Sequence, residues 1–222
     1  MKKHLLWVLP LCLLCGAMIF GIVKRETYID ALKQENYLDQ LLVAEIHEQF
    51  AEAQCSNMLQ NLPQVPIILR VEAVGEIEHL FHVSRQKIII REVYAGEGLA
   101  AGEEYYLFAR AWRLSLDGYY NAINTGYVNM LEAGTEYLVF VEDVLEDLKG
   151  DLPALKVYDD GRVSTVPVFC YEDRQSVVIP LSEDPTYVPY KDVKDNEFFA
   201  TSEKGLEMLE ALKGKILSLY PR

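Results

Sequence analysis

Residues 67–77 have the sequence IILRVEAVGEI, and residues 87–94 have the sequence KIIIREVY. In the first stretch Leu69, Val71 and Ala73 alternate with charged or small residues, which is typical of a strand with one buried face. The second stretch is rich in β-branched residues, which strands favour. Similar stretches follow at residues 104–111, 136–142, 155–158, 163–170 and 176–179. Glycine- and proline-containing turns separate them without intervening helical patterns, which predicts a mainly β fold, an antiparallel β-barrel or sandwich.

Helical periodicity flanks this β-rich region on both sides. Between residues 26 and 62, apolar residues recur every four positions, at Leu38, Leu42, Ile46 and Phe50. This spacing predicts a helix that is either a stalk or packs on the following domain, and that ends at Pro63. Near the other end, Ser202 is a predicted N-cap. The apolar residues after it predict a C-terminal helix that packs on the barrel, through Leu206, Leu209, Leu212, Ile216 and Leu219.

Residues 5–23 read LLWVLPLCLLCGAMIFGIV and contain no charge. As a helix, these 19 residues would extend about 28 Å, close to the hydrocarbon thickness of a bilayer. Lys2 and Lys3 precede the stretch, and Lys24 and Arg25 follow it. We predict an uncleaved, single-pass transmembrane helix in the cell membrane, with a cytoplasmic N-terminus and an extracytoplasmic domain. A cleaved signal peptide, which would make the protein secreted, and a lipid anchor are the alternatives.

The overall composition narrows the class of partner. The chain carries 21 Lys and Arg residues against 34 Asp and Glu residues, a net charge of −13. An acidic surface repels phosphate backbones, so we expect no nucleic-acid partner. The simpler explanation of the acidity is that it keeps the domain soluble. Because half of the residues are apolar and a quarter are charged, wholesale disorder and collagen-like architectures are excluded.

Four segments carry a resemblance to a known family. They are IILRVEAVGEIE from residue 67, KIIIREVYAGEGLAAGEEYYL from residue 87, NMLEAGTEYLVFVED from residue 129 and VPVFCYED from residue 166. In their order and punctuation they resemble the netrin-module and tissue-inhibitor-of-metalloproteinase superfamily. The similarity covers roughly residues 55–180 and rests on pattern rather than on a diagnostic motif. It implies a five-stranded, Greek-key OB barrel with flanking helices.

The resemblance also bears on the cysteines. In that superfamily a cysteine of the N-terminal segment is tied to a later barrel strand, which makes Cys55 and Cys170 the matching disulfide candidates here. The alternative is two independent buried thiols, which a cytoplasmic domain would require. The inhibitors bind a protease zinc through the free amine of an N-terminal cysteine. Because a predicted helix and anchor precede Cys55, and the other family cysteines are absent, we do not expect metalloproteinase inhibition.

Few residues suggest chemistry. His79 and His82 are the metal candidates, because a turn between two strands could bring their imidazoles together, although such histidines are more often solvated. The chain has no GxSxG, HExxH or P-loop motif, and we assign no catalytic residue, no cofactor and no further metal ligand. Aromatic residues near barrel connections could line a ligand face or simply pack the barrel. These candidates are Tyr105, Tyr119, Tyr120 and Tyr127.

Together these patterns predict four parts of the chain. They are a membrane anchor or signal peptide at residues 1–25, a helical stalk at 26–62, an OB-like β-barrel at 63–181, and a tail with the C-terminal helix at 182–222. We predict a membrane-anchored, extracytoplasmic binding or interaction module for a protein or small cell-surface ligand, without enzymatic activity. The alternatives are a metal-dependent or hydrolytic enzyme with a site that motifs do not reveal, and, by fold analogy alone, a peptidase-regulating protein.

Overall fold

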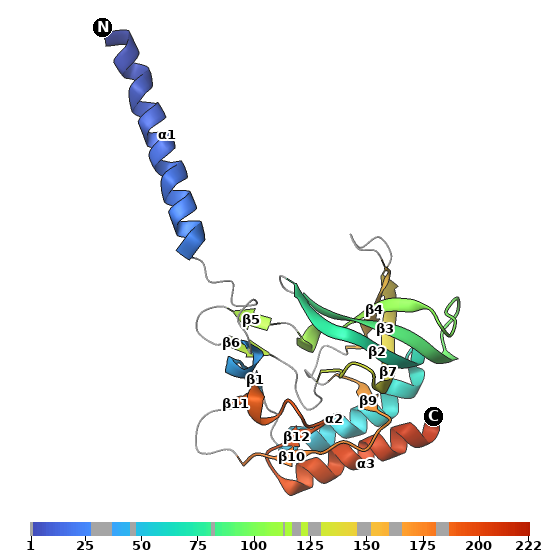
Figure 1. The fold of residues 1–222 in the computed structure, drawn as a ribbon. Helices are drawn as coiled ribbons and strands as arrows, with labels where there is room; N and C mark the ends of the chain where they lie inside the picture. Colours follow the sequence, from blue (N-terminus) through green and yellow to red (C-terminus); the bar gives the residue numbers. More distant parts are fainter. Residues whose placement is uncertain are drawn as a thin grey trace. The chain divides into compact units, whose positions relative to one another are not determined.

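The chain divides into two units, Met1–Tyr37 and Leu38–Arg222. The computed structural model describes residues 2–27, 37–44, 48–80, 83–112, 114–116, 121–123, 130–145, 152–159, 166–180 and 187–222. In Figure 1 the first unit contains the blue helix, and the second contains the sheets and the remaining helices. The second unit confirms the prediction of a mainly β fold with a multi-strand sheet and a few helices.

The first unit contains helix α1, Lys2–Thr27. Its last turn carries Lys24 and Arg25, whose charges suit the negative end of the helix dipole. Large apolar side chains along it are exposed, namely Leu13, Leu14, Met18, Ile19, Phe20, Ile22 and Val23. Among the described residues, no helix combines the length and the apolar character that a membrane crossing requires. The anchor expected over residues 5–23 therefore stays a prediction.

The main sheet of the second unit has six strands in the order β2-β3-β4-β8-β7-β9, and β2 also pairs with β7. The strands are β2 (Ile67–Leu80), β3 (Val83–Ala95), β4 (Glu104–Phe108), β7 (Glu136–Leu145), β8 (Ala154–Val157) and β9 (Val168–Cys170). Most neighbours are antiparallel, as predicted, but β4 and β8 are parallel. The sheet is therefore not the all-antiparallel barrel that the strand pattern alone predicts, and the OB-like barrel stays a prediction.

The long β2–β3 hairpin bends where its register shifts. One shift lies between Val74 and Glu78, and Gly75 there has φ +69°, a backbone conformation that glycine adopts without strain. The Gln86 side chain, which is only 1% exposed, donates a hydrogen bond to the Gly75 carbonyl oxygen at 2.9 Å. This buried amide therefore satisfies a carbonyl that the regular ladder leaves unpaired.

The two faces of the sheet have different partners. Cross-strand pairs such as Leu69–Val139 and Val71–Ile90 are fully buried and face the inside of the curved sheet. The opposite face of β7 and β9 packs against helices α2 (Glu48–Asn61) and α3 (Glu203–Leu219), which lie side by side below the sheet in Figure 1. The resulting core joins strand, helix and loop residues, among them Ile68, Leu138, Phe140, Phe169, Cys55, Met58, Leu212 and Ile216.

The helix predicted over residues 26–62 is corrected by the structure. In its described part, the α-helix begins only at Glu48, and residues 42–44 form strand β1 (Leu42–Ala44). This strand pairs with β11 (Tyr187–Pro189) and β6 (Asn121–Ile123) in a small second sheet, and β5 (Leu114–Leu116) pairs with β6 at one edge of that sheet. The four-residue spacing of apolar residues therefore did not distinguish a helix from a strand at residues 42–44. Helix α2 packs on the domain rather than forming a stalk.

The C-terminal helix forms as predicted and buries Leu209, Leu212 and Ile216, but Leu219, which was expected to pack with them, is 57% exposed at the end of the helix. Ser202 is its N-cap, because its hydroxyl oxygen accepts a hydrogen bond from the Gly205 N–H at 3.1 Å. The same hydroxyl donates to Glu48 at 2.6 Å, and Lys204 pairs with Glu48 at 3.0 Å. Glu48 therefore connects the N-terminal end of α2 with the N-terminal end of α3. Short strands β10 (Val177–Val178) and β12 (Phe199–Ala200) pair in parallel just before α3.

Candidate interaction surface

Ion pairs cover the outer face of β2, β3 and β4. Arg85 bonds Glu78 at 2.9 Å, and Lys87 pairs with Glu104 on the neighbouring strand at 2.8 Å. These residues are opposite or diagonal neighbours on antiparallel strands, so their side chains share one face. We call this surface the paired-charge face and define it by Glu72, Glu78, Arg85, Lys87, Arg91, Glu104 and Tyr106.

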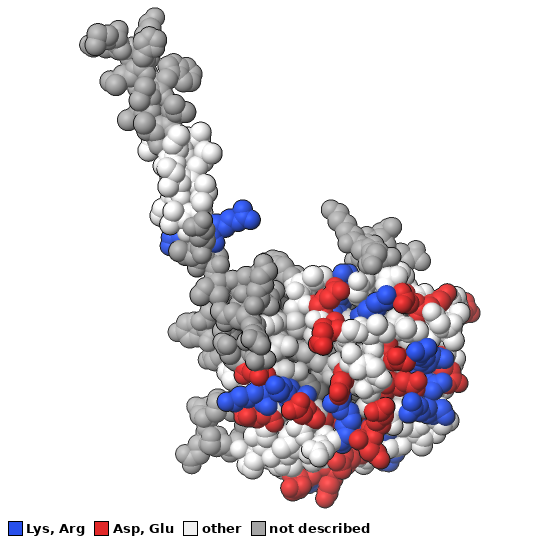
Figure 2. All heavy atoms as spheres, viewed as in Figure 1, with Lys and Arg blue, Asp and Glu red and all other residues white. Residues whose placement is uncertain are grey.

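Arg91 also belongs to the paired-charge face and lies where the β2–β3 register shifts. The shift between Arg70 and Val71 leaves Arg91 without a direct cross-strand partner in the ladder. Its guanidinium instead binds one oxygen of Glu72 through two nitrogens, at 2.9 and 2.6 Å. Exposed pairs of this kind are each worth about 0–1 kcal/mol. Figure 2 shows basic and acidic atoms interspersed over the described surface of this view.

An aromatic ring lies within the paired-charge face. Tyr106 is directly opposite Lys87 in the β3–β4 ladder, and the Arg85 guanidinium carbon lies 3.7 Å from the centroid of its ring. A cation stacked on a ring in this way is stabilised by the ring quadrupole. Tyr106 is 7% exposed, so the ring lies beneath the Arg85 guanidinium and does not project into solvent.

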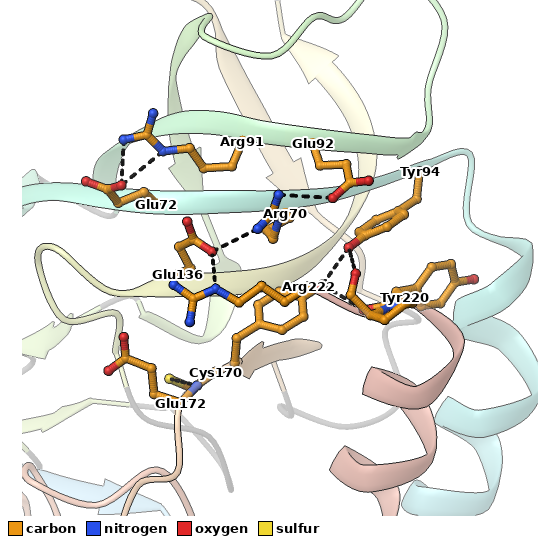
Figure 3. A network of polar contacts seen from close by, with 12 residues as sticks. Arg70, Glu72, Arg91, Glu92, Tyr94, Glu136, Cys170, Glu172, Tyr220 and Arg222 are labelled. Carbon is orange, nitrogen blue, oxygen red and sulfur yellow. Dashed lines mark hydrogen bonds and ion pairs between the residues drawn. The ribbon is translucent and has the colours of Figure 1, made fainter.

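A second polar network lies at the end of the hairpin nearest α3 (Figure 3). Arg70 lies between Glu92 and Glu136, at 3.1 and 3.2 Å, and Arg222 reaches the same Glu136 oxygen at 3.0 Å. The Glu136 side chain is 16% exposed, so two cations neutralise a largely buried carboxylate. The Arg70 Nε is buried and has no hydrogen-bond partner among the described residues.

Two tyrosine hydroxyls meet beside this network. The Tyr94 and Tyr171 oxygens are 3.1 Å apart, while Tyr94 also donates to the Pro221 carbonyl at 2.5 Å and Tyr171 to the Tyr220 carbonyl at 2.9 Å. Each hydroxyl has one proton, so the two carbonyl bonds use both. Burial raises the pKa of both tyrosines, and both therefore remain protonated donors at neutral pH.

A buried ion pair lies beside the end of β9. Glu197 is 4% exposed and pairs with Lys213 of α3 at 2.5 Å, while its other oxygen accepts a hydrogen bond from the Cys170 N–H at 3.0 Å. Burial raises the pKa of Glu197, and Lys213 opposes this shift. Lys213 also donates to the Glu172 carbonyl at 2.9 Å. The pair thus connects α3 to the end of β9, which is a structural role.

The structure places His79, one of the two predicted metal candidates, near the end of the β2–β3 hairpin. His79 and Ser84 are cross-strand partners, and the His79 Nδ1 is 2.7 Å from the Ser84 hydroxyl oxygen. His82 lies outside the described residues. Among those that are described, no group of three or more His, Cys, Asp and Glu side chains is arranged to hold a metal ion. The Ser84 side chain belongs to a residue only 1% exposed, so a substrate could not reach its hydroxyl.

Burial lowers the pKa of His79 to about 4. The folded protein therefore binds fewer protons than the unfolded chain between pH ~6.5 and ~4, so His79 reduces stability as the pH falls through this window and contributes nothing above it. We expect wild type to lose about 1–2 kcal/mol more unfolding free energy than His79→Gln between pH 7 and pH 4, after allowance for solvent screening. Urea titrations at both pH values measure this difference.

The imidazole NMR resonances of His79, assigned by their absence from His79→Gln, provide a direct check. They should titrate far below the pKa of an ordinary histidine. A midpoint near pH ~6.5 would contradict the burial of this ring.

The two disulfide candidates are free, buried thiols in the structure. Burial raises the pKa of both Cys55 and Cys170 to about 11, so neither is a reactive thiolate at neutral pH. Cys55 belongs to the core between helices and sheet. The bridge that the family resemblance implies therefore stays a prediction.

Among the candidate ligand-face aromatics, Tyr119, Tyr120 and Tyr127 lie outside the described residues. Tyr105 pairs opposite the fully buried Ile88, so it lies on the inner face of the sheet, and its hydroxyl donates to Glu103 at 3.3 Å. Sequence reasoning missed Tyr94 and Tyr171. The missing signal was strand register, because one residue decides which face a ring occupies.

A small hollow lies between α2 and the loops near β8 and β9. Its volume of about 10 Å³ is room for about one water molecule. Its lining is formed by Gln54, Asn57, Met58, Asn61, Leu62, Tyr158 and Pro167. It is too small to hold an organic ligand.

A scan of the chain against models of known protein families finds no match. A search of curated proteins likewise finds no significant relative.

Proposed function

We propose that the chain is a membrane-anchored binding module that presents its paired-charge face to a protein or small cell-surface ligand. The main support for the proposal is that one part of the outer face of the sheet is covered by helices, whereas another part carries exposed charges. Helices α2 and α3 cover β7 and β9, whereas β2–β4 carry side chains such as Arg91, Glu78 and Glu104 that remain between 39% and 46% exposed. Ordered charges around the ring of Tyr106, on which Arg85 stacks, suit recognition of a partner with complementary charges.

We further propose that the main sheet is an OB-like Greek-key barrel. Support comes from the pairing circuit, which runs β2, β3, β4, β8, β7 and returns to β2. Counted along the chain, β3 and β4 are the second and third strands of this circuit. OB folds bind ligands on the face of these two strands, and here that face carries Arg85, Lys87 and Tyr106.

The proposed anchor rests on residues 5–23, which contain no charge, and on the exposed apolar side chains of α1. The basic residues Lys24 and Arg25 end that helix, as is common where a span meets the membrane surface. In this proposal the anchor is uncleaved and the second unit is extracytoplasmic.

Alkaline extraction of membranes tests the anchor. The full chain is expected to stay in the membrane fraction, whereas Leu14→Arg combined with Ile19→Asp should be released, because each charge costs about 2.5–3.5 kcal/mol near the centre of a span. Leu14→Ile with Ile19→Leu is the matched control. Mass spectrometry of the mature chain separates the alternatives, because loss of the first residues would identify a cleaved signal peptide.

Site-specific photo-crosslinking in membranes tests the binding face. A photoreactive residue at Ile89, on the outer face of β3, is expected to give a discrete adduct, whereas the same residue at Lys204 on α3 should not. Adding Lys87→Glu should reduce the Ile89 adduct several-fold while changing stability by less than about 1 kcal/mol. Equal adducts from both positions, or no effect of Lys87→Glu, would rule out this face.

The enzymatic alternative lacks a supporting observation among the described residues. Catalysis needs titratable groups that converge where a substrate can reach them. In the partly buried His79–Ser84 contact, Ser84 is 1% exposed, and the imidazole has a pKa of about 4, which makes a weak base. Binding is therefore the function that we propose.

A further inference from the structure

Residues 220–222 lie outside helix α3 and contact residues of the sheet. Helix α3 ends at Leu219, and Tyr220 has φ −131° and ψ 73°. Pro221 lacks an N–H and disfavours helical backbone in the residue before it. The carbonyl groups of this segment are therefore free of helical hydrogen bonds and available to the sheet.

Two hydroxyls bind the backbone of the segment. Tyr94 donates to the Pro221 carbonyl, and Tyr171 donates to the Tyr220 carbonyl. Since every residue has a carbonyl, these bonds recognise the backbone rather than a particular side chain. The two tyrosines are 77 residues apart in sequence, so this pair of donors exists only in the folded sheet.

Two side-chain contacts add selectivity. The Tyr220 ring packs against Tyr94 and Phe140, with centroids 5.3 and 5.8 Å apart and tilted or edge-on geometry. Arg222 Nε lies 3.0 Å from a Glu136 oxygen. These contacts match an aromatic residue followed, two positions later, by a cation.

Residues outside the segment also hold Glu136 and Phe140 in place. Arg70 holds Glu136 at 3.2 Å and is itself paired with Glu92 at 3.1 Å. The Phe140 ring is fully buried and packs edge-on against Phe169 at 6.2 Å. The carboxylate and the ring are therefore also positioned by residues outside the segment, and the proposal requires that the site persists when residues 220–222 leave.

We propose that Tyr94, Glu136, Phe140 and Tyr171 form a recognition slot for an aromatic–proline–arginine peptide, and that residues 220–222 occupy this slot in cis. A partner segment of the same chemistry binds when the cis segment is displaced. Tethering favours the cis occupant, because its effective concentration is high. The slot shares no residue with the paired-charge face, although its Glu136 is the cross-strand partner of Glu72. The two proposals are tested with different variants and different ligands, so failure of either can be told from failure of the other.

Fluorescence anisotropy with a labelled Ser-Leu-Tyr-Pro-Arg peptide tests the slot. The full-length Tyr220→Ala/Arg222→Ala variant is expected to bind the peptide saturably. The wild type and the Leu219→Ala control should bind at least about tenfold more weakly, because the slot is open in only a fraction of the molecules. Peptides ending Tyr-Pro-Glu or Ala-Pro-Arg should bind the open variant at least several-fold more weakly than the parent peptide.

Three outcomes would overturn the proposal. They are no saturable binding by the open variant when its circular dichroism matches wild type, equal binding of the Tyr-Pro-Glu peptide, and equal binding by wild type.

A second measurement keeps the test decisive if the open variant does not fold. The Arg222 Nε–H resonance of wild type should be shifted and slow to exchange, and Glu136→Gln should move it to random-coil values. A random-coil resonance in wild type would exclude cis occupancy.

Discussion

Replacing Lys213 with methionine is expected to destabilise the protein by about 3–5 kcal/mol, because it leaves a buried carboxylate without its partner. Glu197 is 4% exposed and Lys213 15% exposed, so water cannot replace the lost ammonium group. Urea denaturation followed by circular dichroism measures the change in unfolding free energy. The loss should be smaller at pH 5 than at pH 8, since Glu197, with its pKa raised further, takes up a proton in the folded state as the pH falls.

Two variants distinguish the effect of losing the ion pair from the effect of losing side-chain packing. Glu197→Gln combined with Lys213→Met removes both charges and should recover a large part of the lost stability. Lys204→Met breaks the pair with Glu48, in which the lysine side chain is 62% exposed, and should cost less than about 1 kcal/mol. Equal costs for Lys213→Met and Lys204→Met would contradict the burial of the Glu197 pair.

Replacing Phe140 with alanine is expected to cost about 3–5 kcal/mol, the range for deleting a fully buried aromatic ring. Phe140 is 0% exposed and belongs to the core that joins the sheet to α2 and α3. Its loss opens a cavity at the layer boundary, so amide exchange in α3 should accelerate together with exchange in β7. Thermal denaturation and hydrogen exchange measure the two effects.

Leu219→Ala is the matched control for Phe140→Ala. Leu219 is an apolar residue of α3 but is 57% exposed, and surface substitutions of this kind usually stay within about 0.5 kcal/mol. If α3 exchanged independently of Phe140, the helical layer would not belong to the same cooperative unit as the sheet.

Local patterns predicted the regular elements well. The stretches at residues 67–77, 87–94 and 136–142 correspond to β2, β3 and β7, and the Ser202 cap and the buried stripe of α3 are also confirmed. These features depend on neighbours within a few positions, and alternation or a 3.6-residue period records them directly. The helix over 26–62 was wrong in its extent because β1 pairs with strands more than 75 residues away.

The candidate surfaces were less predictable. Sequence reasoning chose Tyr105 for a ligand face, but register places it inward and places Tyr106 on the outer face. Likewise, Tyr94 and Tyr171 have no sequence signal that joins them. Such pairs are created by tertiary neighbours, for which a single sequence carries no local record.

From its residues alone, then, this chain specified an N-terminal helix with an uncharged central stretch, a β-rich domain and a capped, amphipathic last helix, because hydrophobic period and capping chemistry act over a few residues. Only the folded sheet brought Glu197 to Lys213, Arg70 to Glu136 and residues 220–222 to two distant tyrosines. Those contacts depend on strand order and register, which set distances between residues far apart in the chain.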